Sequence, residues 1–343
     1  MPRIMYAPKK RVLILSESSD YSTNQVLDCL HEMSVECIRI NHEDITNLVG
    51  NIDLQKESPD LIFSLKKQQY NIIKDFSAIW FRRTTFAPQR LSIVAAEDLP
   101  SAAQFALKQY LFNEQLFFSQ TVHRLILRHA NFVLGNPFVF QANRLWTQQK
   151  AKDIGFSVPK SVVLNNKAGL QEFYKKRNEQ IICKGLQEAF SLELSDTMLH
   201  SYTSCLSEKD IDLLPEYFAP SLFQEKIDKE FEIRIFYLMK SCYAMAIFSQ
   251  NDPQTQIDFR KYNKDKPNRC VPFSLPQTIE NMLQMLMTSL DLNTGSIDLI
   301  FTKNKEFVFL EVNPVGQYDF VSKYCNYQLD QKIAHLLYEQ SIK

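Results

Sequence analysis

Apolar and polar positions in the first third of the chain alternate between short buried-type runs and helical patterns. Residues 11–16 (RVLILS) are an apolar run that ends in Ser-Glu-Ser-Ser-Asp. Such a run is typical of a buried parallel strand, and it leads here into a loop and a predicted helix over 23–33. Gly135, Asn136 and Pro137 end this region. The pattern predicts a small α/β domain, with further strands at 35–40, 60–64 and 78–80 and a long helix over 101–131.

The pattern of the remaining chain predicts two α+β lobes. A helix that stops at Gly155 is followed by a strand, a helix and the strand QIICKG. The polar stretch 187–217 has no clear period. Longer strand-type runs and two helical patterns then follow, at 221–227, 231–239, 242–249, 276–290 (helix), 295–314 (hairpin) and 325–340 (helix). We therefore predict three domains, with boundaries at 1–132, 133–222 and 223–343.

Composition and charge exclude several classes of protein. The 343 residues carry 39 basic and 39 acidic side chains, so no global field favours nucleic acid or an anionic membrane. No apolar stretch approaches the roughly 18 residues of a membrane span, and the N-terminus lacks the features of a signal peptide. There is no Cys-x-x-Cys, His-Glu-x-x-His, Gly-x-Gly-x-x-Gly or Walker motif. We expect a cytoplasmic protein with reduced thiols.

Candidate metal ligands lie in the last predicted hairpin. Glu311 and Asn313 are two apart at the end of one strand, so their side chains leave the same face. Asp298, in the preceding strand, can meet them across the turn. Two carboxylates and an amide oxygen are the hard ligands that Mg²⁺ prefers. A solvated strand end is the alternative interpretation of these residues.

Two further stretches suit a nucleotide. Lys184 ends an apolar strand, where a phosphate would offset the cost of burying its charge, although a lysine can also extend to solvent there. The run 224–227 (QEKI) can face an adenine edge, unless it is an ordinary amphipathic strand. Glu230 follows within reach of a ribose, and Glu232 competes for that role.

Lysine, then Gln-Glu-Lys-Ile, then Asp…Glu-x-Asn occur in the order typical of the ATP-grasp superfamily, which the chain resembles over about residues 135–320. The resemblance implies an N-terminal pre-ATP-grasp α/β domain and two lobes that clamp ATP. The roles that it implies are phosphate binding by Lys184, adenine binding by Gln224, Glu225, Lys226 and Ile227, ribose binding by Glu230, two Mg²⁺ ions on Asp298, Glu311 and Asn313, and a backbone N–H from Gly316 near the reacting carboxyl group. Many relatives have a second phosphate-binding lysine where this chain has Arg144.

Other stretches are similar to those of the graspetide (microviridin-type) peptide maturases, most of all to those of the grasp-with-spasm systems. They cover nearly the whole chain and include ILSESSDYSTNQVLDCL, IRINHED, IWFRRTTF, IDFRKYN and FLEVNPVGQYDFVSKYCNYQLDQKIA. The resemblance implies that an Asp or Glu side chain of a precursor peptide becomes an acylphosphate. A Ser, Thr or Lys side chain of the same peptide then closes an ester or amide ring.

Arginines are the candidates for binding the γ-phosphate or the acceptor carboxylate, because a guanidinium binds either in bidentate geometry. Arg234 lies in an apolar strand, and Arg260 and Arg269 lie in or beside the basic loop FRKYNKDKPNR, which could instead be a mobile loop. The pair Arg82–Arg83 is interpreted as structural.

The resemblance also implies partners: a precursor peptide with a leader that binds the central lobe, for which 187–217 is a candidate surface, a radical-SAM/SPASM protein and a second copy of this chain. Two other functions stay open. One is an ATP-grasp ligase for a free amino acid or small peptide. The other is a regulatory nucleotide-binding protein without turnover, against which the presence of all three metal ligands argues.

Overall fold

The protein was analysed as a computed structural model. It describes residues 11–47, 52–53, 55, 59–65, 68–86, 99–186, 191–194, 197–200, 202–261, 263 and 265–342. The chain forms two compact units, residues 1–140 with 328–343, and residues 141–327. The three ranges predicted from the sequence stay a prediction, and the two units are described separately below.

The first unit contains a parallel sheet with strand order β2-β1-β5-β6. Every residue of β1 is buried, as expected for a parallel strand covered on both faces. Asp20 caps helix α1 by accepting a hydrogen bond from the backbone N–H of Thr23 (3.1 Å). The elements named so far are β1 (Arg11–Ser16), α1 (Tyr21–Glu32), β2 (Glu36–Asn41), β5 (Ala78–Phe81) and β6 (Val133–Leu134).

Asp20 also accounts for the arginine pair that follows β5. Arg82 Nε lies 3.4 Å and Arg83 Nε 3.3 Å from the carboxylate of Asp20, and Arg82 and Asp20 are both almost completely buried. Burial raises the pKa of Asp20, but the two guanidinium groups and the Thr23 hydrogen bond outweigh it, so the pKa is lowered overall. The arginine pair therefore has a structural role within this unit.

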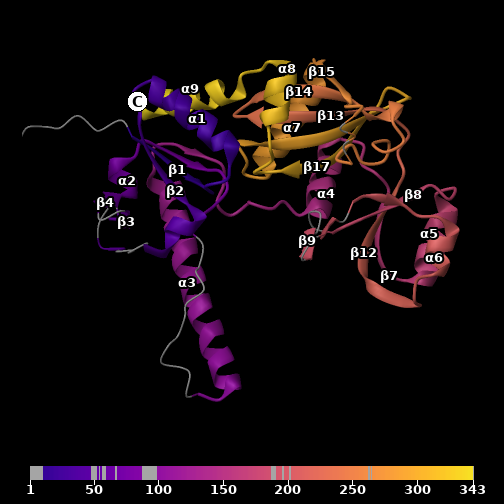
Figure 1. Cartoon of the computed structure of the whole chain (residues 1–343), viewed down its shortest axis with the longest axis horizontal. Coiled ribbons are helices and arrows are strands. Elements are labelled where there is room, and N and C mark those ends of the chain that lie inside the picture. The colour runs from indigo at the N-terminus through magenta and orange to yellow at the C-terminus, as the bar shows by residue number, and fades with distance from the viewer. Residues whose placement is uncertain are drawn as a thin grey trace, which may run out of the picture. The chain divides into compact units, whose positions relative to one another are not determined.

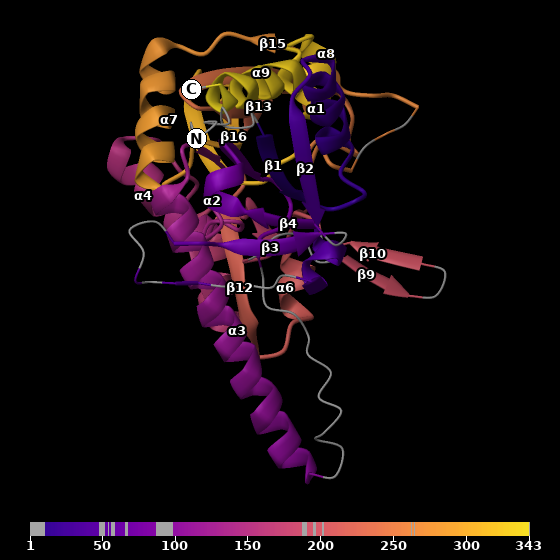
Figure 2. The ribbon, with the colours of Figure 1, turned by 90° about the vertical axis from the view of Figure 1, so that its left-hand side faces the viewer.

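Two helices complete the first unit. Helix α3 (Ser101–His129) packs on the core through Val122 and Ile126, whereas its N-terminal part extends past the strands of its unit (Figures 1 and 2). Helix α9 (Leu329–Ser341) packs against α1, β1 and β5. The predicted tail helix over 325–340 is therefore α9, and it belongs to the first unit rather than to a C-terminal lobe. The hairpin β3 (Ile62–Leu65) and β4 (Gln68–Asn71) and the short helix α2 (Ile72–Asp75) complete the unit.

The second unit begins with helix α4 (Arg144–Ile154), which ends at Gly155 with φ 112°. An antiparallel sheet of order β11-β8-β12-β7 follows, with α5 and α6 packed against it through Leu170, Phe173 and Ile211 (Figure 1). The elements of this lobe are β7 (Ser161–Asn166), α5 (Lys167–Lys176), β8 (Ile181–Lys184), β9 (Ser191–Leu194), β10 (Thr197–His200), β11 (Ser204–Cys205), α6 (Glu208–Asp212) and β12 (Tyr217–Glu225). The strands β9 and β10 form a separate hairpin.

The unit ends with an antiparallel sheet of order β15-β14-β13-β16-β17. One face is apolar and carries the aromatic pairs Phe231–Phe301 and Phe301–Phe307. The other face carries charged side chains. The elements are β13 (Lys229–Leu238), β14 (Ser241–Phe248), β15 (Arg269–Phe273), α7 (Gln277–Ser289), β16 (Thr294–Thr302), β17 (Phe307–Asn313) and α8 (Asp319–Cys325). None of the helices in the described ranges is long and apolar enough to cross a membrane.

A β-bulge sets the side-chain directions in β17. Asp298 pairs with Glu311, but Leu299 pairs with Phe309, so Leu310 is an extra residue in β17. Strict alternation would place Glu311 on the same face as Phe309, which is completely buried. The bulge changes this, so that Phe309 enters the apolar core while Glu311 faces the charged side with Asp298.

Candidate active site

A cavity within the second unit is lined by both of its sheets. Most of the lining residues come from strands β8, β12, β13, β16 and β17 and from the loops after β12 and β14, and the others include Arg144 at the start of α4 and Thr203 before β11. Of the predicted site residues, it contains Arg144, Lys184, Gln224, Glu225, Lys226, Ile227, Arg234, Arg260, Asp298 and Glu311. Residues that are 167 positions apart in the sequence thus share one cavity.

The β16–β17 ribbon brings the predicted metal ligands together. Asp298 and Glu311 are directly opposite each other, and Asn313 pairs with Ser296 one step along the same face. The bulge at Leu310 is held from two sides, since Gln148 Nε2 donates to the carbonyl of Leu310 (2.8 Å) and Phe309 N donates to the carbonyl of Ser157 (2.8 Å). The ribbon end is therefore fixed by segments outside the sheet.

Each carboxylate of the ribbon has an arginine partner. Arg144 binds one oxygen of Glu311 through Nε (2.8 Å) and Nη2 (2.7 Å), and its Nη1 donates to the carbonyl of Gly185. Arg234, on the neighbouring strand β13, binds Asp298 at 2.6 Å. Arg144 and Gln148 are one helical turn apart on α4, so one face of this helix binds both the Leu310 carbonyl in the bulge and the Glu311 carboxylate.

Burial and charge act differently on the two carboxylates. Burial raises the pKa of Asp298, and the neighbouring Glu311 raises it further, against the opposing effect of Arg234. Burial also acts to raise the pKa of Glu311, but Arg144 and Lys184 outweigh it and the pKa is lowered. Two facing carboxylates in a partly desolvated site repel each other, and added positive charge relieves that repulsion.

The chemistry of the donor set fits a divalent cation. Asn313 Oδ1 is buried and has no hydrogen-bond partner among the residues that the structure describes. An orphaned amide oxygen next to two carboxylates matches the all-oxygen ligand set of Mg²⁺. The described residues contain no cluster of three His, Cys, Asp or Glu side chains, so the amide is required to complete a protein ligand set of three.

Lys184 lies at the end of β8 beside this ribbon. Burial lowers its pKa, and the Glu311 carboxylate acts in the opposite direction. In the paired strand β12, Gln224 is completely buried and its Nε2 donates to Ser161 Oγ (2.8 Å) and Gln148 Oε1 (3.3 Å). Glu225 Oε1 accepts from the backbone N–H of Lys160 (2.8 Å). The 224–227 segment is thus anchored at one wall of the cavity.

The two candidates for the ribose-binding carboxylate lie in different places. Glu230 lies outside the cavity lining and forms an ion pair with Lys305. Glu232 lines the cavity, is buried, and pairs with Lys229, which was not predicted from the sequence. Burial raises the pKa of Glu232, with Lys229 and Ser249 opposing. A one-residue irregularity in β13 between Lys229 and Phe231 explains why these close neighbours diverge.

Three other predicted residues are not in the cavity lining, namely Asn313, Arg269 and Gly316. Arg269 begins the edge strand β15, with its guanidinium 5.2 Å from the ring centre of Phe248. Gly316 is buried against Ser296, where an added Cβ would approach the Ser296 Cβ to 2.4 Å, and its N–H donates to the carbonyl of Asn313 (3.1 Å). Glycine is therefore required at 316 for packing beneath the ribbon.

Three solved structures that share this architecture are a macrocyclase and a peptide-related ligase of named organisms and the ligase PsnB. Macrocyclase MdnC bound with precursor peptide MdnA, from Microcystis aeruginosa, is 26% identical, with a TM-score of 0.71 over 95% of this chain and 98% of that chain. The RiPP-associated ATP-grasp ligase of Chryseobacterium gregarium, in complex with ADP and a leader and core peptide, is 23% identical, with a TM-score of 0.75 over 96% and 97%. The ATP-grasp ligase PsnB, with a phosphomimetic variant of a minimal precursor, Mg and ADP, is 14% identical, with a TM-score of 0.71 over 98% and 100%. The chain has the fold of the ATP-grasp peptide macrocyclases.

No protein-family model and no curated protein gave a match to the sequence. The fold and the ATP-grasp resemblance predicted from the sequence motifs are nonetheless confirmed by the solved structures, which match along almost the entire chain. Within this fold the predicted site residues that line the cavity come mainly from β8, β12, β13, β16 and β17. Their individual roles stay predictions.

Sequence reasoning missed several residues of this candidate site. Asp258 lines the cavity and binds Arg260, and Gln148 joins Gln224 to the bulge at Leu310. For Asp258 a signal was present, because Asp and Arg two positions apart in IDFRKYN can form a local ion pair. Gln148 has no local sequence signal, because its partners are distant in the sequence. Lys229 has none, because its pairing with Glu232 depends on the irregularity in β13. The candidate leader surface over 187–217 lies partly outside the described residues, which omit 187–190, 195–196 and 201.

Proposed function

We propose that the protein is an ATP-dependent ligase that forms macrocycles in a ribosomally made precursor peptide. The observation that carries the proposal is the cavity that Asp298, Glu311 and Lys184 line beside the 224–227 segment, with Asn313 following Glu311 on the same ribbon. Support comes from the similar solved structures, which are bound to precursor peptides and, in PsnB, to Mg and ADP.

The proposed reaction has two steps. An Asp or Glu carboxylate of the peptide attacks the γ-phosphorus of ATP, the bond to the β–γ bridging oxygen breaks, and ADP leaves. A Ser or Thr hydroxyl, or a Lys amine, then attacks the acyl carbon. The nucleophile loses its proton and inorganic phosphate leaves with the former carboxylate oxygen. Each ring therefore costs one ATP and removes one water from the peptide.

The residues of the cavity are suited to bringing two anions together. Asp298, Glu311 and Asn313 would hold Mg²⁺, two ions in the arrangement that the resemblance implies, and Mg²⁺ bound there supplies positive charge against the triphosphate. Lys184 is placed to donate to phosphate oxygens. Arg234 and Arg144 hold the ribbon carboxylates in place, and Arg260 supplies a further cation. Glu232, rather than Glu230, is the carboxylate available to a ribose inside this cavity.

The test is an ADP-release assay with the full chain, ATP, Mg²⁺ and a precursor peptide that carries its leader. We expect turnover that requires the peptide, and a peptide mass reduced by one water for each ring. Brisk ADP release with free amino acids and no peptide would replace the proposal with the alternative of a small-molecule ligase. Nucleotide binding without turnover on any of these substrates would favour the regulatory alternative.

We propose that the protein works as a homodimer that associates through helix α3. None of residues 101–118 is buried, and Phe105 and Phe117 are 71% and 67% exposed. Phe105 and Phe112 lie seven residues apart on one side of the helix, and Tyr110 and Phe117 lie seven residues apart on the other side, so exposed rings surround this part of α3. Sedimentation velocity should show a dimer that Phe105→Ser with Phe117→Ser converts to monomer. A monomeric wild-type protein would refute the dimer.

The radical-SAM/SPASM partner stays a prediction, to be tested by co-purification of the two proteins.

A further inference from the structure

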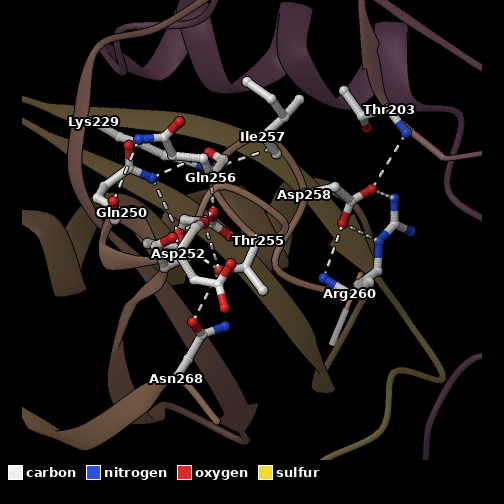
Figure 3. Close-up of polar contacts among 12 residues, drawn as sticks. Thr203, Lys229, Gln250, Asp252, Thr255, Gln256, Ile257, Asp258, Arg260 and Asn268 are labelled. Atoms are coloured by element: carbon white, nitrogen blue, oxygen red, sulfur yellow. Dashed lines mark hydrogen bonds and ion pairs between the residues drawn. The ribbon is translucent and has the colours of Figure 1, made fainter. Parts of the chain in front are cut away.

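Asp258 and Arg260 form a closed local pair at the wall of the cavity (Figure 3). Asp258 Oδ1 accepts from Arg260 Nε (2.8 Å) and from the Arg260 backbone N–H (3.1 Å), and Oδ2 accepts from Arg260 Nη2 (2.6 Å). Oδ2 also accepts from the backbone N–H of Thr203 (3.3 Å). A carboxylate offers about four acceptor positions, so Asp258 has no remaining capacity for a metal or a substrate.

The pair leaves one edge of the Arg260 guanidinium open. Asp258 takes the Nε–Nη2 edge, and Nη1 points away from Asp258 in Figure 3. No described residue accepts a hydrogen bond from Nη1, and the Arg260 side chain is 45% exposed, whereas that of Asp258 is 4% exposed. Glu311 and Asp298 lie close enough to contribute to the raised pKa of Arg260, of which the Asp258 hydrogen bonds are the main cause. The open edge thus lies in the charged part of the cavity.

Asp258 also ties Arg260 to the opposite wall of the cavity. Thr203 directly precedes β11, and Ser204 of β11 pairs with Cys183, the neighbour of Lys184. On the side of the second sheet, Lys229 Nζ donates to the carbonyl of Ile257 (3.3 Å). The loop between β14 and β15 is therefore fixed at two adjacent residues, Ile257 and Asp258.

A long arginine side chain loses rotamer entropy when it is immobilised. Asp258 imposes that cost during folding, before any ligand arrives. We propose that Asp258 is a positioning residue, which holds Arg260 so that its open guanidinium edge binds an oxyanion of the reaction, either the peptide carboxylate or the γ-phosphoryl group. This inference rests on the proposed function, because that function supplies the oxyanion.

The test compares Asp258→Asn with Asp252→Asn, a matched control in the same loop. Asp252 is also buried and holds the loop through Gln254 N (2.9 Å) and Asn263 Nδ2 (2.7 Å), but it binds no arginine. We expect Asp258→Asn to raise either the KM for the peptide or the Kd for ATP relative to ADP by about 10- to 100-fold. The first result assigns the oxyanion to the peptide carboxylate and the second to the γ-phosphoryl group. Asp252→Asn should change neither by more than about threefold.

A double-mutant cycle with Arg260→Ala separates positioning from a general structural role. If Asp258 acts through Arg260, adding Asp258→Asn to Arg260→Ala causes no further loss. Additive losses, or unchanged peptide and nucleotide parameters in Asp258→Asn, would overturn the inference.

An NMR measurement distinguishes this failure from failure of the proposed function. In arginine labelled with ¹⁵N, the Nε–H resonance of Arg260, assigned by its loss in Arg260→Lys, should exchange slowly in the wild-type protein and rapidly in Asp258→Asn. Slow exchange in both proteins would refute the pairing even if the enzyme turns over. A wild-type protein that is inactive with every precursor peptide would refute the proposed function, while the NMR result would still decide the pairing.

Discussion

Glu311→Gln should stop the reaction while leaving the fold almost unchanged. The substitution keeps the size of the side chain and removes one negative charge. Arg144 loses the negative charge of the carboxylate whose one oxygen it contacts through two nitrogens, at 2.7 and 2.8 Å, and a charge-assisted hydrogen bond is worth about 1.5–3 kcal/mol. The glutamine oxygen still accepts one hydrogen bond, and the repulsion of the facing Asp298 disappears. We therefore expect the free energy of unfolding to fall by no more than about 1–2 kcal/mol.

The effect on activity should be much larger. Loss of a charged metal ligand removes several kcal/mol of stabilisation of the developing charge, and about 3–4 kcal/mol corresponds to a 100- to 1,000-fold lower kcat/KM. The assays are ADP release with precursor peptide, and thermal unfolding of the same preparation. Glu306→Gln is the matched control, because Glu306 is exposed in the turn of the same hairpin.

A Glu311→Gln variant with a wild-type rate and an unchanged Tm would refute the assignment of the ribbon as the metal site. If the variant unfolds, Asn313→Ala provides a second test. Asn313 Oδ1 has no hydrogen-bond partner in the described part of the chain, so its loss should leave stability unchanged. Full activity in that folded variant would contradict the three-ligand site.

Three further predictions address binding, stability and pH. Lys184→Ala should weaken ATP binding by about 10- to 100-fold, the value of one charge-assisted contact, and unchanged affinity in calorimetry would count against its role. Asp20→Asn keeps the helix cap but removes the negative charge that faces the buried Arg82, so the free energy of unfolding, measured in urea, should fall by about 3 kcal/mol or more. An unchanged free energy of unfolding would mean that other groups satisfy the arginine pair. Because the pKa of Asp20 is lowered in the folded state, its contribution is complete above its ordinary pKa of about 4 and is lost as the pH falls further. The stability difference between wild type and Asp20→Asn should therefore be constant near neutral pH and shrink in acid, and a difference that persists unchanged in acid would contradict this linkage.

The sequence-based predictions are accurate where the interactions involve residues close together in the sequence, and they fail where the partners are far apart. Lys184 and the Gln-Glu-Lys-Ile run were found because a charged or amide group at the end of an apolar strand is visible in a few residues. The pairing of Asp298 with Glu311 followed from a short hairpin, and the structure confirms it. Glu230 and Glu232 could not be separated, because the irregularity in β13 that divides them depends on pairing with β16.

Local patterns also missed the destination of the last helix. Its amphipathic period is evident in the sequence, but nothing in that period says which surface it covers, and it packs on the first unit against α1. The partners of Arg144 were hidden for the same reason, since Glu311 lies 167 residues away. Long-range partners are chosen by shape and charge that exist only after the sheets have formed.

By itself, the sequence determined most of the longer strands and helices, the candidate oxygen ligands of the last hairpin and the likeness to ATP-grasp proteins, because side-chain period and local motifs act within a few residues. Only the tertiary structure decided which face of the sheet Glu311 occupies. The bulge at Leu310 shifts the side-chain alternation of β17, and hydrogen bonds from Gln148 and to Ser157 stabilise that bulge. The tertiary structure also decided which cations meet those carboxylates. A strand can specify that a side chain points outward, but the groups that it meets there depend on the packing of the other elements.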